Sequence, residues 1–150
     1  MKAKFKLAHM RAAQVYADLS YAQRRKVGCV IVKDDTIIGI GYNGTPPGWE
    51  NVCEENGATK PEVIHAEQNA LDKVIRGTIS SVGSSIFVTT APCLECAKRI
   101  HGAGIREVYY LEVYRSDDGL KFLAKAGIHI EKIGPNKDDE GCFESRGMNK

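Results

Sequence analysis

The chain reads His65-Ala66-Glu67 at one point and Pro92-Cys93-Leu94-Glu95-Cys96 at another. These two segments form an H-x-E followed by a P-C-x-x-C. One imidazole and two thiolates supply three of the four ligands that a tetrahedral zinc ion takes. With three protein ligands the fourth position stays open to water, which distinguishes catalytic zinc from structural zinc. Glu67, close to the metal without binding it, is predicted to move protons.

Each part of this pattern also has another interpretation when taken alone. A single histidine at the start of a helix is usually a polar surface residue. A C-x-x-C that follows a strand and opens a helix is also typical of thioredoxin-like redox pairs. The redox interpretation leaves His65 and Glu67 unexplained, whereas Cys93 and Cys96 share one face of a helix start that favours thiolates. The joint pattern therefore favours zinc, with one catalytic ion per chain.

A structural zinc would need a fourth protein ligand, and the chain has five cysteines. Cys29 lies in an apolar run, where a small thiol is expected to belong to the core. Cys53 lies in a long loop and could reach a metal, while Cys142 lies in a polar tail. Neither competes convincingly with water. The odd count, without a secretory signal, favours reduced thiols over a disulfide scaffold.

Length and composition set the class of the protein. With 150 residues, 43% hydrophobic and 27% charged, the sequence is that of one ordinary globular domain. The net charge of +2 comes without a long basic run, so long nucleic acid is not favoured as a ligand. No segment approaches the roughly 18 apolar residues of a membrane span, and a cytoplasmic protein is expected. We expect a domain over residues 1–134 and a loose polar tail over 135–150.

The apolar periodicity and the turn residues predict alternating helices and strands. Helices are expected at about 3–19, 65–76, 92–102 (opened by Pro92) and from the Ser116 cap to 126. Strands are expected at 27–32, 36–40, 85–89, 107–111 and 128–133, the first two as a hairpin. A long loop separates residue 42 from residue 63. This order predicts an α/β domain with a mixed sheet covered by helices on both faces.

Four segments carry a family resemblance: Lys26–Val32, Gly41–Pro46, His65–Leu71 and Ala91–Lys98. The chain resembles the cytidine deaminase superfamily, and within it the deoxycytidylate (dCMP) deaminase branch, from about residue 6 to residue 133. The zinc motifs are shared by many deaminases, whereas the G-Y-N-G-x-P segment narrows the expected substrate to a deoxynucleotide monophosphate. The resemblance implies a three-layer α/β/α fold around a mixed five-stranded sheet. It places the protein in the cytoplasm, or in the host cytoplasm if a phage encodes it.

The resemblance implies hydrolytic deamination of dCMP to dUMP and ammonia, which would supply thymidylate synthesis. Glu67 would take a proton from the zinc-activated water, protonate N3 of the cytosine and then protonate the leaving amine. Glu95, inside the C-x-x-C, is a poorer candidate. It is expected to face solvent from the first helical turn.

The substrate contacts are less specific. By resemblance Asn43 would bind the deoxyribose, although a turn asparagine is the simpler interpretation. The cluster Arg24-Arg25-Lys26 is the obvious candidate for the 5′-phosphate, and its alternative is a solvated charge run. Ala66 and Tyr114 are assigned to the pocket wall, although Tyr114 could belong to the core edge.

The resemblance also implies regulation and assembly. Members of the branch are typically oligomers, here expected to be hexamers, activated by dCTP and inhibited by dTTP with Mg²⁺ on the triphosphate. Asn43, Gly44 and Arg76 are the expected effector contacts. Two other functions stay open: a zinc deaminase of another base, such as tRNA adenosine or free cytosine, and a catalytically silent nucleotide sensor. The intact Glu67 argues against the sensor.

Overall fold

The computed structural model of the chain describes residues 1–134. The helices are α1 (Ala3–Ala17), α2 (Ala66–Ile75), α3 (Leu94–Gly102) and α4 (Asp118–Lys125). The strands are β1 (Gly28–Lys33), β2 (Thr36–Tyr42), β3 (Glu54–Glu55), β4 (Ala58–Thr59), β5 (Ser85–Thr90), β6 (Glu107–Glu112) and β7 (His129–Lys132). Within this part of the chain, none of the helices has the length and apolarity needed to cross a membrane. The expected tail, with Cys142, lies outside the described residues.

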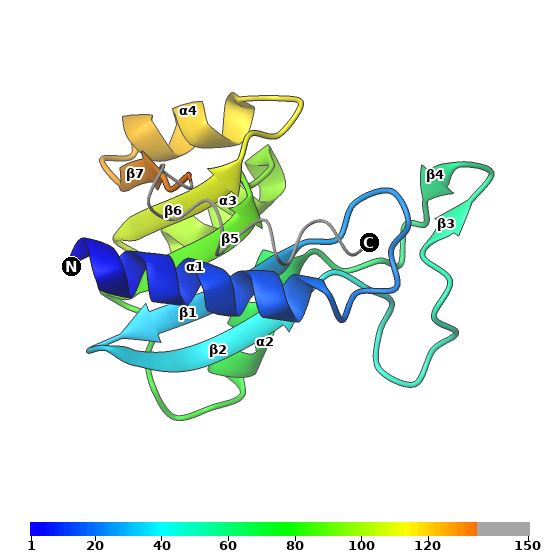
Figure 1. Cartoon of the computed structure of the whole chain (residues 1–150), viewed down its shortest axis with the longest axis horizontal. Helices are drawn as coiled ribbons and strands as arrows, with labels where there is room; N and C mark the ends of the chain where they lie inside the picture. Colours follow the sequence, from blue (N-terminus) through cyan, green and yellow to red (C-terminus); the bar gives the residue numbers. More distant parts are fainter. Residues whose placement is uncertain (135–150) are drawn as a thin grey trace.

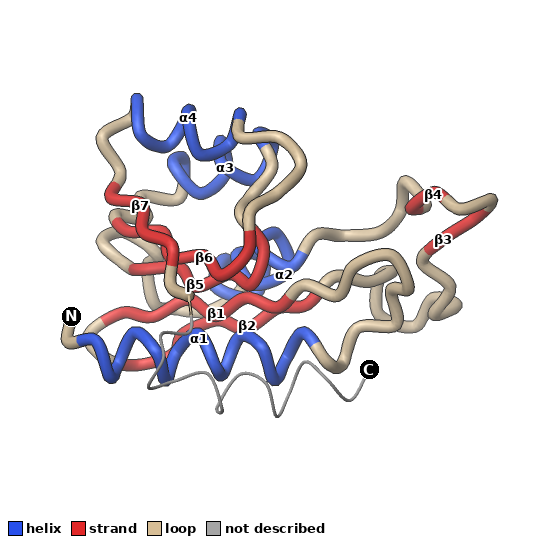
Figure 2. The backbone as a smooth tube through the Cα atoms, turned by 45° about the horizontal axis from the view of Figure 1, so that its top comes forward, coloured by secondary structure: helices blue, strands red, loops and turns tan. Residues whose placement is uncertain are grey.

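Five strands form the central sheet in the order β2-β1-β5-β6-β7 (Figure 1). The pairs β1–β2 and β1–β5 are antiparallel, whereas β5–β6 and β6–β7 are parallel. Helix α1 covers one face of the sheet, and α2 and α3 cover the other (Figure 2). Helix α4 packs against α3 and β7. The expected mixed sheet in a three-layer α/β/α fold is therefore confirmed.

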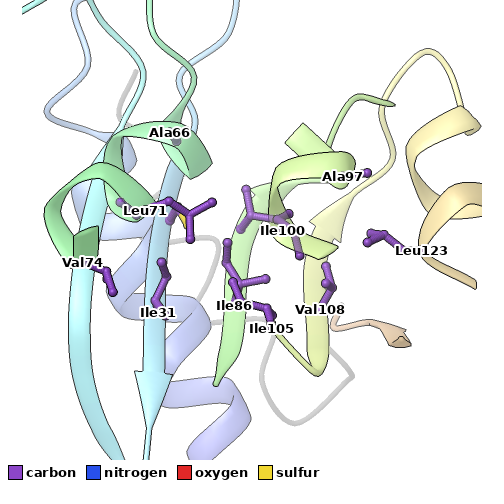
Figure 3. Packing of buried hydrophobic residues seen from close by; sticks show 13 residues of the cluster. Ile31, Ala66, Leu71, Val74, Ile86, Ala97, Ile100, Ile105, Val108 and Leu123 are labelled. Atoms are coloured by element: carbon purple, nitrogen blue, oxygen red, sulfur yellow. The ribbon is translucent and has the colours of Figure 1, made fainter. Parts of the chain in front are cut away.

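The core has one apolar cluster on each face of the sheet. On the α2–α3 face, Ile31, Ile86 and Val108 from the strands meet Leu71 and Ile100 from the helices (Figure 3). All six residues of β5 are buried, because its two faces serve both clusters. Each large apolar side chain that leaves water stabilises the fold by about 1.5–3 kcal/mol. The sheet is thus a rigid support for the helices whose first turns carry the site residues.

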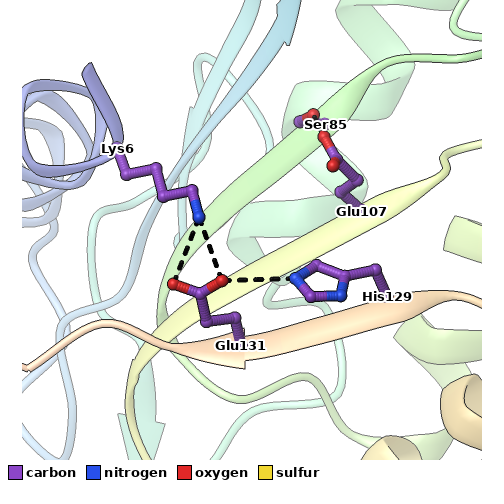
Figure 4. Close-up of polar contacts among 5 residues, drawn as sticks. All are labelled: Lys6, Ser85, Glu107, His129 and Glu131. Carbon is purple, nitrogen blue, oxygen red and sulfur yellow. Dashed lines mark hydrogen bonds and ion pairs between the residues drawn. The ribbon is translucent and has the colours of Figure 1, made fainter. Parts of the chain in front are cut away.

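On the α1 face, an aromatic pair lies at the centre of the cluster. The rings of Phe87 and Tyr109 stack with their centroids 4.6 Å apart, beside the buried Met10 of α1. At the edge of this layer Lys6 Nζ lies 3.0 Å from Glu131 Oε1, an oxygen that also lies 3.2 Å from His129 Nε2 (Figure 4). These contacts attach the first helix to the last strand.

Helix α2 rests on β2 at a glycine. A Cβ atom at Gly41 would lie 2.3 Å from the carbonyl oxygen of Ala66 and 2.6 Å from the backbone nitrogen of Ala70. Only a residue without a side chain allows this approach of helix to strand. The start of α2, which carries the H-x-E motif, is therefore seated directly on the backbone of the hairpin.

The segment expected to be one long loop contains a small hairpin. Strands β3 and β4 pair through Glu54 and Thr59 around Asn56-Gly57, whose φ angles are +55° and +77°. Asn-Gly with two left-handed residues is the common two-residue hairpin turn. The flanking strands are two residues long and lack apolar alternation, so periodicity did not indicate them. The hairpin projects beyond the end of the main sheet (Figure 1).

Two helix starts differ slightly from the prediction. Helix α3 begins at Leu94 with Cys93 as its N-cap, so Pro92 lies just before the helix instead of in its first turn. Helix α4 has Asp117 as its N-cap, while Ser116 Oγ accepts a hydrogen bond from the backbone of Asp118 at 3.3 Å.

Candidate active site

His65 is held at the N-terminal end of α2. Its extended backbone (φ −68°, ψ 153°) makes it the N-cap, and its side chain is exposed. Glu67, in the first turn, points inward and keeps only 4% of its surface exposed. The apolar residues Ala70, Leu71 and Val74 bury the same helix against the sheet. The exposed imidazole of His65 and the buried carboxyl of Glu67 therefore both lie at the N-terminal end of α2.

The two thiols come from the start of α3, which lies beside α2 on the same face of the sheet. Cys93 caps α3 and Cys96 lies one turn further along, with the backbone of Ala97 bonded to the Cys93 carbonyl at 2.9 Å. Cys96 is buried and Cys93 is half-buried. The spacing of three residues at a helix start puts both sulfur atoms on one side, as the sequence predicts. Glu95, between them, is exposed and paired with Lys98, so its expected orientation toward solvent is confirmed.

The structure brings the three predicted zinc ligands together. His65 Nδ1 lies 3.3 Å from Cys96 Sγ and 3.6 Å from Cys93 Sγ, and the three ligand atoms lie within 4.8 Å of one another. Zinc–nitrogen and zinc–sulfur bonds of about 2.0 and 2.3 Å at a tetrahedral angle place the two donor atoms about 3.5 Å apart. The donor set and its spacing therefore fit zinc.

The remaining described cysteines lie outside this group. Cys29 is fully buried among apolar residues, which confirms its expected place in the core. Cys53 is buried in the loop before β3 and lines the neighbouring cavity.

The electrostatics of the thiol pair also suit a cation. A hydrogen bond from Cys96, opposed by burial and assisted by His65, lowers the pKa of Cys93 to about 4. The same hydrogen bond, together with burial and the nearby Glu67, raises the pKa of Cys96. Without a cation the pair therefore holds one thiolate, and a divalent ion would stabilise the second.

Glu67 has the environment of a proton carrier. Burial raises its pKa to about 7, although its own helix-start backbone and His65 lower it. A carboxyl group with a pKa near neutrality can both accept and donate protons at physiological pH. It lies in the wall of a cavity that His65 and Cys93 also line.

This cavity has a volume of about 490 Å³, enough for a nucleotide. Of the residues predicted to bind substrate, Arg24, Arg25, Asn43, Ala66 and Tyr114 line it. Lys26 does not line it. The predicted site residues His65, Glu67 and Cys93 line it as well. The lining residues that were not predicted to belong to the site include Cys53, Glu54, Ala58, Thr59, Val63, Thr90, Ala91 and Arg115.

Arg115 could have been found from the sequence by one argument. It follows Tyr114 just beyond β6, and Ala91 follows β5, so both lie after the carboxyl ends of parallel neighbours. Ligands of α/β sheets bind at that edge. Glu54 and Thr59 have no such signal, because the two-residue strands β3 and β4 show no apolar alternation.

Asn43 is occupied with the loop that carries the arginines. Its Oδ1 accepts a hydrogen bond from the backbone of Val27 at 2.9 Å, and its Nδ2 donates to the carbonyl of Arg25 at 2.8 Å. Ser20 Oγ donates to the Asn43 carbonyl at 2.8 Å. Its contact with a deoxyribose stays a prediction.

A second, smaller cavity of about 190 Å³ is lined by residues 42–47. Two of the three expected effector contacts, Asn43 and Gly44, line it. The third, Arg76, is the C-cap of α2 and lines neither cavity. The cation that lines the smaller cavity is Lys73, whose Nζ donates to the carbonyl of Ile40 at 2.9 Å.

Comparisons with known proteins agree with this site. Residues 3–112 match the sequence model of the cytidine and deoxycytidylate deaminase zinc-binding region. The chain is 35% identical to the deoxycytidylate deaminase of Saccharomyces cerevisiae over 136 residues, 83% of this chain and 43% of that protein. It is 37% identical to the human deoxycytidylate deaminase over 140 residues, 84% of this chain and 78% of that protein. The chain thus spans less than half of the yeast relative.

The solved structures include a close match in fold. The dCMP deaminase from the cyanophage S-TIM5, in complex with dCMP and dUMP, superposes with a TM-score of 0.87 at 43% identity. The alignment covers 89% of this chain and 99% of that chain. With the His65, Cys93 and Cys96 donor set in place and most of the chain matched, this protein belongs to the cytidine and deoxycytidylate deaminase zinc-binding family.

Proposed function

We propose that this chain catalyses the hydrolytic deamination of dCMP to dUMP and ammonia. The observation that carries the proposal is a buried carboxyl group, Glu67, in the same cavity as His65 and Cys93 of the His65-Cys93-Cys96 donor set. The match to dCMP deaminases of yeast, human and cyanophage supports the choice of substrate. The dUMP formed would supply thymidylate synthesis.

A zinc ion held by the two thiolates and the imidazole would act as a Lewis acid that activates a water molecule. Glu67 moves the protons. Its carboxylate accepts a proton from the water and delivers it to N3 of the cytosine while the water oxygen forms a bond to C4. Glu67 then takes the second proton from that oxygen and delivers it to the exocyclic amine, so that the C4–N bond breaks, ammonia leaves and the C4 carbonyl of dUMP forms. The burial that raises its pKa to about 7 makes both directions of transfer accessible at neutral pH.

The 5′-phosphate would be held at the opposite side of the cavity. Arg24 and Arg25 from the loop before β1, and Arg115 from the loop after β6, all line it. One guanidinium group can donate two parallel hydrogen bonds to two oxygens of a phosphate. These charge-assisted hydrogen bonds are about twice as strong as hydrogen bonds between neutral groups. Lys26 remains a weaker candidate, since it does not line the cavity.

The test is a deamination assay with dCMP, CMP, deoxycytidine and cytosine. We expect the highest kcat/KM for dCMP, at least about tenfold above deoxycytidine, since charge-assisted hydrogen bonds to the phosphate are worth about 1.5–3 kcal/mol each. Glu67→Gln is the control for a contaminating deaminase. Equal activity on dCMP and deoxycytidine would contradict phosphate recognition, and no activity on dCMP would contradict the function.

We also propose that the enzyme is a hexamer activated by dCTP and inhibited by dTTP, with Mg²⁺ on the triphosphate. The smaller cavity beside Asn43 and Gly44 supports an effector site there. Lys73 joins Arg76 as a candidate for the phosphate contact. Both lie on or at the end of α2, which begins beside His65, so an effector could move the helix. Allosteric coupling is typically about 1–3 kcal/mol.

Lys73→Glu and Arg76→Glu distinguish the two cations. The variant that replaces the cation in contact with the effector phosphate should lose its response to both nucleotides and keep its zinc. Initial rates against dCMP, with and without dCTP–Mg²⁺ or dTTP–Mg²⁺, give the response, and analytical ultracentrifugation gives the subunit number. Two variants that both respond like the wild type would place the effector elsewhere.

A further inference from the structure

The loop that carries Arg24 and Arg25 has no regular structure of its own. Residues 18–27 connect α1 to β1, and the two arginines are exposed where the loop passes the large cavity. A loop of this kind loses conformational freedom when a ligand orders it, and that loss weakens binding. Whatever fixes its backbone in advance therefore strengthens the binding of a phosphate.

One carboxylate fixes the loop from the side of the small hairpin. Glu54 Oε2 accepts hydrogen bonds from the backbone nitrogens of Gln23 at 2.9 Å and Arg24 at 3.1 Å. Two consecutive N–H groups that converge on one anion form a favourable cradle for negative charge. Thr59 Oγ1, across the same hairpin, accepts a bond from Arg24 Nη1 at 3.5 Å. Glu54 also lines the large cavity.

The opposite side of the loop is held by Asn43, through its bonds to Arg25 and Val27. The loop is thus fastened at two points, one on each side of the arginine pair. The Asn43 fastening belongs to the hairpin of the main sheet. The Glu54 fastening comes from a hairpin that otherwise projects away from the domain (Figure 1).

We propose that Glu54 is a positioning residue for substrate binding, which orders the Gln23–Arg24 backbone so that Arg24 and Arg25 face the 5′-phosphate. The proposal rests on the proposed function, because it requires a phosphate in the large cavity. Glu54 itself donates nothing to the substrate. It acts through the loop, and its carboxylate suits this role because charge-assisted bonds to backbone N–H groups are stronger than neutral ones.

The negative charge of Glu54 and its hydrogen bonds to the loop predict opposite changes in KM when Glu54 is replaced, and this makes the proposal testable. A carboxylate beside a phosphate site repels the phosphate, so its removal alone would lower KM for dCMP. Loss of the fastening raises KM instead. The sign of the change in Glu54→Ala therefore distinguishes positioning from simple repulsion.

The experiment measures KM and kcat for dCMP in Glu54→Ala, Glu54→Gln and Glu55→Ala. Glu55 is the matched control: it lies next on β3, is exposed, and has no side-chain hydrogen bond to any described residue. We expect Glu54→Ala to raise KM about tenfold, the effect of one lost charge-assisted bond, with kcat changed by less than about twofold. Glu54→Gln keeps an acceptor oxygen and should recover most of the wild-type KM. Glu55→Ala should resemble the wild type.

Direct titration with dUMP gives a second readout that does not depend on turnover. The Kd for dUMP should rise with KM in Glu54→Ala and stay near the wild-type value in Glu55→Ala. A lower or unchanged KM in Glu54→Ala would overturn the positioning role, as would an equal rise in Glu55→Ala. A wild-type protein that does not deaminate dCMP would instead refute the proposed function, so the two failures are distinguishable.

Discussion

Gly119→Ala should weaken zinc binding, although the residue is neither a ligand nor near one in the sequence. Gly119 is buried in the first turn of α4, where a Cβ atom would lie 2.1 Å from the carbonyl oxygen of Pro92 and 3.0 Å from the carbonyl group of Cys93. The contacted atoms belong to the backbone of Pro92 and of the zinc ligand Cys93, so no flexible side chain can move aside. One of the two backbones must shift by roughly 1 Å, and such overpacking costs about 1–3 kcal/mol.

The helix itself would favour the change. Alanine is better than glycine in a helix by about 0.5–1 kcal/mol, so any loss of stability must come from the contact with the zinc loop. Substitutions that displace a metal ligand through its supporting residues typically lower metal affinity about 10–100-fold. We expect a loss in this range for Gly119→Ala, measured by competition with a chromogenic chelator.

Gly102→Ala is the matched control. Gly102 is the last residue of α3, and a Cβ atom there has no heavy atom within 4 Å. This variant should keep its zinc and gain up to about 1 kcal/mol. Unfolding with and without zinc separates a local effect from a general one, because only displacement of Cys93 reduces the stabilisation that zinc provides. If Gly119→Ala holds zinc as tightly as Gly102→Ala, α4 does not set the position of the thiol loop.

Three further predictions concern the site and the fold. Cys93→Ser should lose most of its zinc in metal analysis because a hydroxyl is a poor zinc ligand; full retention would refute the ligand assignment. Glu67→Gln should keep zinc and bind dUMP but lose about 10²–10⁴-fold in kcat, since an amide cannot carry protons; near-normal turnover would show another proton carrier. Burial raises the pKa of Glu131, but the hydrogen bonds from Lys6 and His129 outweigh burial, and the net pKa is lowered. The ionised Glu131 therefore stabilises the fold at pH values above the pKa of the unfolded chain, and this stabilisation is lost as the pH falls through the pKa of the folded protein. The difference in unfolding free energy between wild type and Lys6→Met, at most about 1 kcal/mol for a surface pair, should therefore shrink from pH 7 to about pH 3, and a constant difference would contradict the pairing.

The zinc donors could be predicted from the sequence because their information is local. His65 and Glu67 lie two residues apart at one helix start, and Cys93 and Cys96 lie three apart at another. Helix geometry puts the two thiols on one side of their helix start, and it puts the Glu67 carboxyl in the first turn after the His65 cap, without knowledge of the rest of the fold. The succession of helices and strands along the chain followed similarly from alternating apolar periods.

The wall of the large cavity could not be predicted in the same way. Glu54 and Thr59 come from one short hairpin and Arg115 from a loop far along the chain, and none belongs to a periodic pattern. Asn56-Gly57 is typical of a hairpin turn, but its flanking strands are too short and too polar to produce a periodic pattern. In the sequence, Lys73 does not differ from any exposed lysine of a helix. Only the structure shows that it lines the smaller cavity together with Gly44.

The glycine contact between β2 and α2 has a consequence for which substitutions the chain tolerates. A helix that rests on side chains changes its position when those side chains change volume, since cores transmit strain. Here the first turn of α2 rests on backbone at Gly41, and its position does not depend on the volume of any side chain at that point. Exchanges among apolar residues at Leu71 and Val74 should therefore reduce stability without moving His65 or Glu67. The apolar positions in the later turns of α2 can therefore change in sequence while the first turn keeps His65 and Glu67 in place.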